Sequence, residues 1–393
     1  MKIARIFTGD IDNRKGKFNN VIERIKHLQK LSEVESDIYI IQYKYMWLFR
    51  WLRKVPKKNI VESVTIDGIK LKMLWVRLSL LEYLLVHKLK VKDIACKKQL
   101  NKYHDLFKSY DILATHDLLS SHLASLVKKI YNIPFVVTWH GSDINKYPHR
   151  SKSTYNTIKF LLKYADYNFF VSKALMKNSD TITRTKNKTH LYSGPADNFF
   201  RKSDEEIDRL KKKLQITSKN VIGFIGNLEP IKNVMVLPEI FHYIQNQVQE
   251  ETSFVVIGNG RLEYQLKEKL KSLEVSNVTF SGKILPKEVS NYLNVITVLV
   301  LPSLNEGMPL VTLEAQACNV HVVGSNVGGI PESIGERNSF ALGPNFIDNI
   351  SKRIIGIILN KEKPSLLSNE FSWGKTIQKE MQVYNEILHN KIK

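Results

Sequence analysis

The chain has 393 residues, which at about 150 residues per domain predicts two or three domains and excludes a single small module. Hydrophobic residues make up 43% of the chain and aromatic residues 10%, values typical of a globular protein with a sizeable core and not of a disordered one. The 59 Lys and Arg residues against 38 Asp and Glu give a net charge of +21. This charge favours negatively charged partners, such as nucleic acid, acidic lipid or phosphorylated small molecules.

The excess charge lies in the N-terminal half. Residues 1–200 carry 36 basic and 17 acidic side chains, a net of +19, whereas residues 201–393 carry 23 and 21, a net of +2. Residues 44–108 alone carry 16 basic and 5 acidic side chains. Aromatic and leucine side chains are interleaved with them: Trp47, Phe49, Trp51, Trp75, Leu78, Leu80, Leu81, Tyr83, Leu84 and Leu85.

Two interpretations of this basic segment remain open. Its lysines could meet anionic lipid headgroups while its apolar side chains enter the membrane interface. Alternatively, the apolar side chains face the core and the lysines only contact solvent. Binding to nucleic acid is a third and weaker interpretation, because no recognised nucleic-acid module accompanies the charge.

The two cysteines, Cys96 and Cys318, can form neither a disulfide framework nor a CxxC metal site, which favours a reducing compartment and hence the cytoplasm. The N-terminal run is too short and too soon charged for the core of a signal peptide. The longest apolar runs, around residues 78–86 and 295–301, are too short or too interrupted for a membrane span of about 20 residues. We therefore expect a cytoplasmic protein that meets a membrane only at its inner surface.

Short β-rich apolar runs alternate with helical patterns along the whole chain, a rhythm that predicts parallel sheets with crossover helices. We therefore expect an α/β fold with two doubly wound, Rossmann-like domains. The expected helices include residues 21–31, 120–130, 234–244 and 262–273. The expected strands are residues 3–7, 37–42, 69–75, 111–115, 135–139, 168–171, 189–192, 221–225, 253–257, 278–280, 298–301 and 320–323.

The pattern breaks near residues 195–203, where the charge balance also changes. We expect a basic N-terminal domain over residues 1–197 and a second domain over residues 198–370. Residues 371–393 have apolar side chains at helical spacing and are expected to form a helix that packs back on the N-terminal domain. Ligands of such domains bind at the carboxyl ends of the strands, so two facing domains imply a cleft.

Residues 302–315 carry the strongest chemical signal. They follow a buried strand and turn into a helix, with Pro309 suited to the first helical turn. The free amides at such a helix start form an anion site. Glu306 in the loop and Glu314 about a turn and a half into the helix can both face one cleft and accept hydrogen bonds from sugar hydroxyls. The alternative is a plain strand, loop and helix with two surface glutamates.

Two further segments end strands in the same way. In residues 224–233 a strand ends in a glycine turn, and Lys232 lies close to the next helix start, which suits a diphosphate. In residues 137–143, His140 follows a strand beside Gly141 and Asp143. A lone histidine is more often structural than catalytic, but glycine and aspartate beside it favour a functional role.

Taken together, these segments resemble family 4 of the retaining nucleotide-sugar glycosyltransferases, which have the GT-B fold, and in particular those of bacterial surface polysaccharide synthesis. The glutamate pair is the most diagnostic element, and the likeness extends over nearly the full chain. The matching elements are Gly16, residues 140–143, 194–200, 226–233, 258–261 and 306–314, and residues 328–332.

The resemblance implies a role for each candidate residue. His140, Lys232 and Glu306 would be catalytic, with Lys232 neutralising the donor diphosphate, Glu306 contacting the donor sugar and His140 reaching the same sugar from the other domain. Glu314 would bind the ribose, and Asp143 would orient the His140 loop. The remaining donor-binding residues would be Gly16, Asn227, Gly258, Ile284, Gly307, Met308, Pro309, Leu310 and Val311.

Three positions depart from the family pattern. Asn227 stands where an arginine commonly accompanies the phosphate-binding lysine, so the donor would depend more on Lys232. The first loop has one glycine, Gly16, instead of two. Asn319 replaces the glycine that often ends the glutamate helix, and asparagine is the next best residue for a left-handed cap.

Asp10-Ile11-Asp12 matches a metal-binding Asp-x-Asp, but it directly follows the first strand and reads as a polar loop. The resemblance implies a metal-independent transfer of a hexose-type sugar from a UDP- or GDP-linked donor, with retention and through an oxocarbenium-like transition state. The acceptor would be a glycan or a polyprenyl-pyrophosphate-linked sugar, with no cofactor and no nucleic acid partner. The alternative is a non-catalytic, basic membrane- or nucleic-acid-binding protein on the same scaffold.

Overall fold

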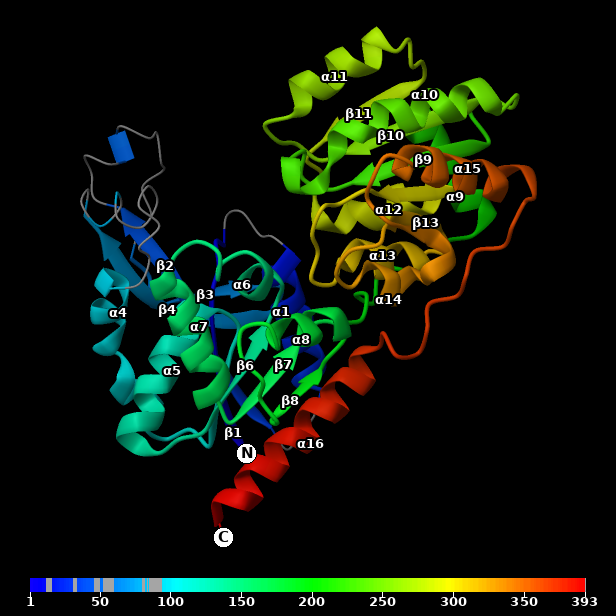
Figure 1. Cartoon of the computed structure of the whole chain (residues 1–393). Coiled ribbons are helices and arrows are strands. Elements are labelled where there is room, and N and C mark those ends of the chain that lie inside the picture. Colours follow the sequence, from blue (N-terminus) through cyan, green and yellow to red (C-terminus); the bar gives the residue numbers. More distant parts are fainter. Residues whose placement is uncertain are drawn as a thin grey trace. The chain divides into compact units, whose positions relative to one another are not determined.

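The computed structural model describes residues 1–11, 16–30, 34–45, 50–51, 60–79, 82, 84 and 94–392. The chain divides into two compact units (Figure 1). Unit 1 comprises residues 1–193 and 373–393, and unit 2 comprises residues 194–372. Each unit contains one sheet with helices around it. This confirms the expected α/β class with two parallel-sheet domains.

Unit 1 contains an eight-stranded sheet in the order β3-β4-β2-β1-β5-β6-β7-β8. All neighbouring strands pair in parallel except β3 and β4. The chain starts at β1, adds β2 on one side and later β5 on the other, so the switch point of the sheet lies between β1 and β5. The strands are β1 (Lys2–Thr8), β2 (Glu35–Tyr45), β3 (Ser63–Ile66), β4 (Ile69–Leu78), β5 (Ile112–Thr115), β6 (Phe135–Trp139), β7 (Tyr167–Phe170) and β8 (Lys188–His190).

The helices of unit 1 connect these strands, and their amphipathic faces pack on the sheet. The expected helix over residues 21–31 begins earlier, at Gly16, and the expected helix over residues 120–130 is confirmed. The helices are α1 (Gly16–Leu28), α4 (Ile94–Asn101), α5 (Leu118–Tyr131), α6 (Ser142–Asn145), α7 (Lys152–Tyr164), α8 (Lys173–Ser179) and α16 (Trp373–Ile392), with a 3₁₀ turn at His104–Phe107.

The hairpin of β3 and β4 is the antiparallel exception that the expected parallel sheet did not include. Its two-residue turn consists of Asp67 and Gly68, which have positive φ angles of 50° and 82°. Both central residues of a type I′ turn require positive φ, and Asp-Gly is a preferred pair for it.

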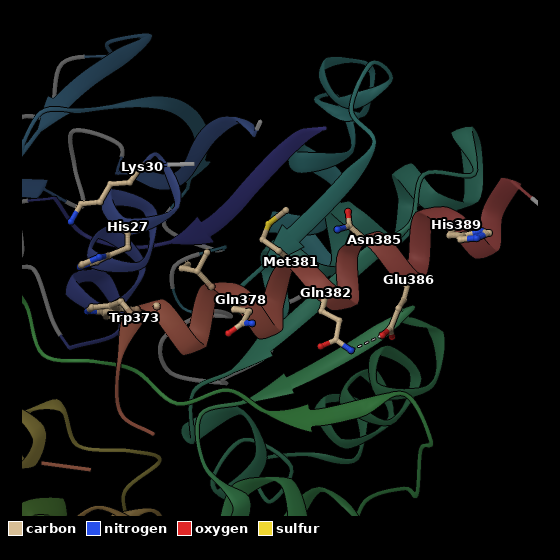
Figure 2. Close-up of a pocket in the computed structure, with 11 residues that line it drawn as sticks. His27, Lys30, Trp373, Gln378, Met381, Gln382, Asn385, Glu386 and His389 are labelled. Carbon is tan, nitrogen blue, oxygen red and sulfur yellow. Dashed lines mark hydrogen bonds between the residues drawn. The ribbon is translucent and has the colours of Figure 1, made fainter. Parts of the chain in front are cut away.

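The C-terminal helix α16 belongs to unit 1, where it packs against α1 and the sheet. At its start the Trp373 ring stacks on His27 of α1, with ring centroids 5.7 Å apart. Both side chains line a pocket of about 900 Å³ beside α16. Figure 2 shows them with the other residues that line it. Further along, Tyr384 is fully buried against Phe169 of β7.

A buried ion cluster fixes α16 on unit 1. Glu380 of α16 accepts hydrogen bonds from Arg5 of β1 at 2.9 Å and from Arg24 of α1 at 2.6 Å. Tyr384 also donates to Glu380. Burial raises the pKa of Glu380, but the two arginines outweigh it and lower the pKa to about 2. The carboxylate is therefore ionised and compensated within the core.

Unit 2 contains a six-stranded, fully parallel sheet in the order β11-β10-β9-β12-β13-β14. The first strand of this unit, β9, has β10 on one side and β12 on the other. The switch point therefore lies between β9 and β12. The strands are β9 (Asn220–Ile225), β10 (Thr252–Ile257), β11 (Val278–Gly282), β12 (Val298–Leu301), β13 (His321–Ser325) and β14 (Ser339–Phe340).

Helices cover both faces of this sheet, which has apolar clusters on each side. The expected helix over residues 234–244 is a 3₁₀ turn (Val234–Val236) followed by α10. The helices are α9 (Asp204–Lys213), α10 (Leu237–Gln247), α11 (Glu263–Ser272), α12 (Val289–Val295), α13 (Leu310–Ala317), α14 (Ile330–Ile334) and α15 (Phe346–Leu359), with further 3₁₀ turns at Pro230–Lys232, Pro286–Glu288 and Glu336–Asn338.

The basic segment over residues 44–108 divides into buried and exposed side chains. Trp75 and Leu78 of β4 belong to the core, whereas Trp51 is 74% exposed and Leu84 is 37% exposed. The other apolar side chains expected there, at positions 47, 49, 80, 81, 83 and 85, lie outside the described residues. No helix in the described part of the chain is long and apolar enough to cross a membrane.

Candidate functional site

Lys232 and Glu306 form an ion pair in unit 2. The Nζ atom of Lys232 lies 2.5 Å from Oε1 of Glu306, and the Ser303 hydroxyl donates to the same oxygen at 2.8 Å. Both charged side chains are largely buried, at 21% and 13% exposed. We call Lys232, Ser303 and Glu306 the Lys232 cluster. The structure thus joins two residues that the sequence places 74 positions apart.

The cluster lies at the switch point of the sheet of unit 2. Lys232 ends the 3₁₀ turn after β9, and Glu306 lies in the loop after β12. Because these strands are neighbours, their carboxyl ends bring the two loops together, and the Leu304 amide donates to the Ile231 carbonyl at 2.9 Å. Asn233 closes the 3₁₀ turn with a positive φ of 52°. The switch point at the carboxyl ends of the strands is where open α/β sheets bind ligands.

Two glycines allow the surrounding loops to approach the cluster closely. A Cβ atom on Gly258 would lie 1.9 Å from the carbonyl oxygen of Gly226, and one on Gly328 would lie 1.9 Å from the carbonyl oxygen of Glu306. Both glycines also have positive φ, 127° and 54°. Any other residue at Gly328 would displace the backbone of Glu306.

Helix α13 begins directly after this loop. Its first residue is Leu310, and Pro309 precedes the helix with an extended ψ of 116°, so the expectation that Pro309 lies in the first helical turn is wrong by one residue. Glu314 lies a turn and a half into the helix and is half-buried. The first-turn amides of Leu310 and Val311 have no carbonyl partner within the helix and supply partial positive charge.

The other candidates of unit 2 surround this arrangement. Gly307 and Pro309 are buried and Met308 is half-buried in the loop before α13, and Asn227 is exposed after β9. Gly258 ends β10. Ile284 is half-buried and packs against the apolar cluster on one face of the sheet. At the helix end, Asn319 has a positive φ of 59°, so the expected left-handed conformation is confirmed.

A second group lies at the carboxyl ends of β1, β5 and β6 in unit 1. His140 follows β6 and is half-buried, and its Nε2 atom lies 3.2 Å from Nδ1 of His116, which follows β5. Asp117 accepts from the Thr8 amide at 2.6 Å and pairs with Lys17 of α1 at 3.0 Å. We call His116, Asp117, His140 and Lys17 the His140 cluster.

Burial and nearby cations determine the ionisation of this cluster. Burial lowers the pKa of His140 to about 3 and that of His116 well below its usual value, and Lys17 and Arg24 act in the same direction. Burial raises the pKa of Asp117, but Lys17 and the amides of Ser120 and Thr8 lower it to about 2. Both imidazoles are therefore neutral at pH 7, and Asp117 is ionised.

The two remaining candidates of unit 1 flank the His140 cluster. Asp143 is buried in α6. Burial lowers the pKa of Lys17, but Asp117 and, to a smaller extent, Asp143 raise it above its ordinary value. Gly16 is the first residue of α1, and a Cβ atom there would meet no atom within 4 Å. No close contact within the described part of the chain therefore requires a glycine at this position. Asp12 of the Asp-x-Asp motif lies outside the described residues.

Sequence reasoning missed His116, Asp117 and Lys17. A signal was present, because Thr115-His116-Asp117 ends the expected strand over residues 111–115 and Asp117 caps α5 in a capping box with Ser120. The rule that selected His140, a polar residue at a strand end, applies equally to His116. Among the described residues, no group of three or more His, Cys, Asp and Glu side chains is placed to hold a metal ion.

Parts of the chain are similar in sequence to known glycosyltransferases. Residues 206–370 match the family model of glycosyl transferases group 1. The chain is 27% identical over 232 residues to the putative teichuronic acid biosynthesis glycosyltransferase TuaC of Bacillus subtilis, covering 59% of this chain and 57% of TuaC. It is 28% identical over 197 residues to the UDP-Gal:alpha-D-GlcNAc-diphosphoundecaprenol alpha-1,3-galactosyltransferase of Escherichia coli, covering 46% and 50%. These alignments thus span only about half of each relative.

Solved structures match over nearly the full chain. HepE of Anabaena in complex with UDP superposes with a TM-score of 0.75 at 16% identity, covering 98% of this chain and 100% of HepE. Sucrose-phosphate synthase of Thermosynechococcus elongatus gives the same TM-score and identity over 99% of both chains. The fold is therefore that of the GT-B glycosyltransferases. The family model of glycosyl transferases group 1 thus matches most of unit 2.

Proposed function

We propose that the protein transfers a hexose-type sugar from a UDP- or GDP-linked donor to a glycan or polyprenyl-pyrophosphate-linked acceptor, with retention of anomeric configuration and without a metal. The observation that carries the proposal is the Lys232–Glu306 pair at the switch point of unit 2, beside the first turn of α13. We place the reaction in cell-surface polysaccharide synthesis, which the names of TuaC and the Escherichia coli galactosyltransferase support.

Lys232 suits the diphosphate of the donor. Its ammonium group has three protons, and one hydrogen bond to Glu306 leaves two for phosphate oxygens. The first-turn amides of α13 add partial positive charge at the same end of the sheet. Together they would stabilise the negative charge that develops on the leaving nucleoside diphosphate, in the role that a metal fills elsewhere.

Glu306 and Glu314 suit hydroxyl groups of the donor. Oε1 of Glu306 already accepts two hydrogen bonds, from Lys232 and Ser303, which fix the orientation of the carboxylate. Its other oxygen is then held in place to accept from a sugar hydroxyl. We assign Glu314 to the ribose, because it lies on α13 about a turn beyond the amides that would meet the phosphates. Gly258 and Ile284 would flank the base.

His140 is proposed to contact the reacting sugar, with Asp143 orienting its loop. Because its pKa is far below 7, His140 is a neutral hydrogen-bonding group and not a general acid. The transition state would be oxocarbenium-like. We propose attack of the acceptor on the same face that the diphosphate leaves, since the sequence offers no obvious carboxylate nucleophile.

The acceptor side is assigned to unit 1, which carries most of the excess charge. The exposed Trp51 and Leu84 lie in its most basic segment, so an anionic membrane surface that presents a lipid-linked acceptor is a suitable partner. A cytoplasmic protein that binds the inner face of the plasma membrane would meet both substrates.

The test is a transfer assay with a panel of UDP- and GDP-sugars and a polyprenyl-pyrophosphate-linked sugar, with and without EDTA. We expect one donor to be consumed at the same rate in EDTA, and the product to show the donor's anomeric configuration by NMR. A true donor should also raise the unfolding temperature by mass action. Loss of transfer in EDTA, an inverted product, or no turnover of any donor would each refute the corresponding part of the proposal.

A further inference from the structure

His116 and His140 form a hydrogen-bonded imidazole pair in which only one of the two facing nitrogens can carry a proton. Nδ1 of His116 lies 3.2 Å from Nε2 of His140, and the ring centroids are 5.5 Å apart. Because both rings are neutral, the pair has two arrangements. Either His116 donates from Nδ1, which leaves a proton on Nδ1 of His140, or His140 donates from Nε2, which leaves Nδ1 of His140 bare.

The surroundings of His116 distinguish these arrangements. Its ring is fully buried, its backbone amide donates to the Ser120 hydroxyl at 3.3 Å, and the ring stands edge-on to Phe7. Its Nε2 atom has no hydrogen-bond partner. If His140 donates, this atom carries a buried N–H without an acceptor, which native proteins rarely tolerate, whereas an unpaired acceptor is tolerated more often.

Charge favours the same arrangement. The charged side chains with the largest effects on His116 are cations: Arg24, Arg5 and Lys17. Asp117, the acidic neighbour in the cluster, is engaged with Lys17, Thr8 and Ser120. A bare lone pair on Nε2 of His116 is attracted by these cations, whereas an N–H there would be repelled.

We infer that His116 is a positioning residue that holds His140 in the Nδ1–H tautomer, so that His140 presents a hydrogen-bond donor to a substrate oxygen. Nδ1 of His140 makes no hydrogen bond within the described part of the chain, so it is the nitrogen left for substrate. The tautomer itself follows from the pair alone, and only the substrate contact rests on the proposed function. A hydrogen-bond donor at this point would stabilise a substrate oxygen that gains negative charge during the reaction. It could not accept a hydrogen bond from a substrate hydroxyl group.

The test reads the tautomer directly by ¹⁵N NMR of protein labelled at its 11 histidines. The His140 signals are assigned by their loss in His140→Gln. At pH 7.5 we expect a protonated Nδ1 and a bare Nε2 on His140. In His116→Leu, His140 should shift towards the Nε2–H form that dominates for free histidine. A wild-type His140 with Nε2–H, or no change in His116→Leu, would overturn the inference whether or not the protein is active.

A matched control and a conservative variant separate positioning from packing. His122 of α5 is a half-buried histidine whose burial lowers its pKa to about 4, and it is bonded to Asn101. His122→Leu should leave the His140 tautomer unchanged. In His116→Asn the side-chain amide nitrogen can occupy the position of Nδ1. We expect it to retain kcat within about 10-fold, whereas His116→Leu should lose about 100-fold with an unchanged affinity for the nucleotide. Equal losses in both folded variants would contradict a hydrogen-bonding role.

Discussion

Oε2 of Glu380 accepts from Nε of Arg24 at 2.6 Å, and both side chains are almost completely buried. The pair joins the last helix to the first helix of unit 1, and Arg5 completes it from the central strand β1. Removing one partner of a buried ion pair leaves the other charge uncompensated, which costs about 3–5 kcal/mol. Glu380→Gln should therefore lower the free energy of unfolding of unit 1 by about 3 kcal/mol.

The measurement is urea unfolding followed by circular dichroism, with Glu386→Gln as the control. Glu386 lies on the same helix but is exposed, and its hydrogen bond is to Gln382 on the helix surface. The free energy of unfolding of this control should lie within about 0.5 kcal/mol of the wild-type value. A Glu380→Gln protein as stable as the control would mean that the two arginines find other partners.

The carboxylates of Glu380 and Asp117 predict the acid limit of unit 1. Both have pKa values lowered to about 2, whereas unfolded Glu and Asp titrate near ~4.3 and ~3.9. A lowered pKa in the folded state stabilises the protein above the unfolded pKa, and this stability is lost as the pH falls through the folded pKa. We expect unit 1 to lose stability progressively between about pH 4.5 and pH 2.

Unfolding measured over this pH range provides the check. In Asp117→Asn and Glu380→Gln one of the two titrating groups is absent, so the slope of stability against pH should be shallower than in the wild type. Variants that are less stable at pH 7 but retain the full slope would show that other carboxylates carry the acid sensitivity.

The sequence predicts the parallel strands well because each is a short, continuous apolar run between polar turns. Strands such as β9 and β12 are buried on both faces, and this burial requires such a run. The antiparallel strand β3 and the two-residue strand β14 do not have such a run and are therefore not predicted. In residues 63–66 only Ile66 is buried, so they form no continuous buried run, and Ser339–Phe340 is too short to show any pattern.

The sequence predicts the candidate residues of unit 2 better than those of unit 1. Lys232 and Glu306 follow strands that end in distinctive loops, so each could be selected separately. Their pairing depends on the order of the strands, which places β9 beside β12 and is not visible in a linear sequence. The pairing of Lys17 with Asp117 depends in the same way on β1 lying beside β5.

Gly328 predicts a steric test of the Glu306 loop. A Cβ atom there would lie 1.9 Å from the Glu306 carbonyl oxygen, and its φ of 54° is unfavourable for alanine. Gly328→Ala should therefore displace Glu306, lowering turnover by about 10-fold or more and stability by about 1–3 kcal/mol. Gly356→Ala is the control, because a Cβ atom there meets nothing and alanine favours helix α15 by up to about 1 kcal/mol. Wild-type turnover in Gly328→Ala would mean that catalysis does not depend on the position of Glu306.

The exposed side chains of the basic segment predict membrane binding. Trp51, at 74% exposed, should insert into an anionic interface, so the protein should sediment with liposomes that contain acidic lipid and less so at high salt. Trp51→Ser should reduce the bound fraction. Leu366→Ser changes an apolar residue of unit 2 that is 84% exposed, and this variant should bind to liposomes as the wild type does. Equal sedimentation with neutral and acidic liposomes at moderate salt would contradict the membrane assignment.

The Lys232–Glu306 pair predicts the largest losses of activity. Lys232→Ala removes the cation proposed to bind the diphosphate, and Glu306→Ala removes the carboxylate proposed to bind the sugar. Each should lower kcat/KM by on the order of 100-fold, the range for loss of one preorganised electrostatic contact. The two variants should differ in binding, because Lys232→Ala should also weaken the affinity for free nucleoside diphosphate, whereas Glu306→Ala should not.

Lys269→Ala supplies the matched control, since Lys269 pairs with Glu239 between α10 and α11 of the same unit and neither residue is a candidate donor-binding residue. It should retain the activity of the wild type. Calorimetry with UDP and GDP gives the affinities, and steady-state kinetics with the identified donor gives kcat/KM. If Lys232→Ala and Lys269→Ala have the same kinetics, then the ion pair at the switch point is structural and the donor diphosphate binds elsewhere on the chain.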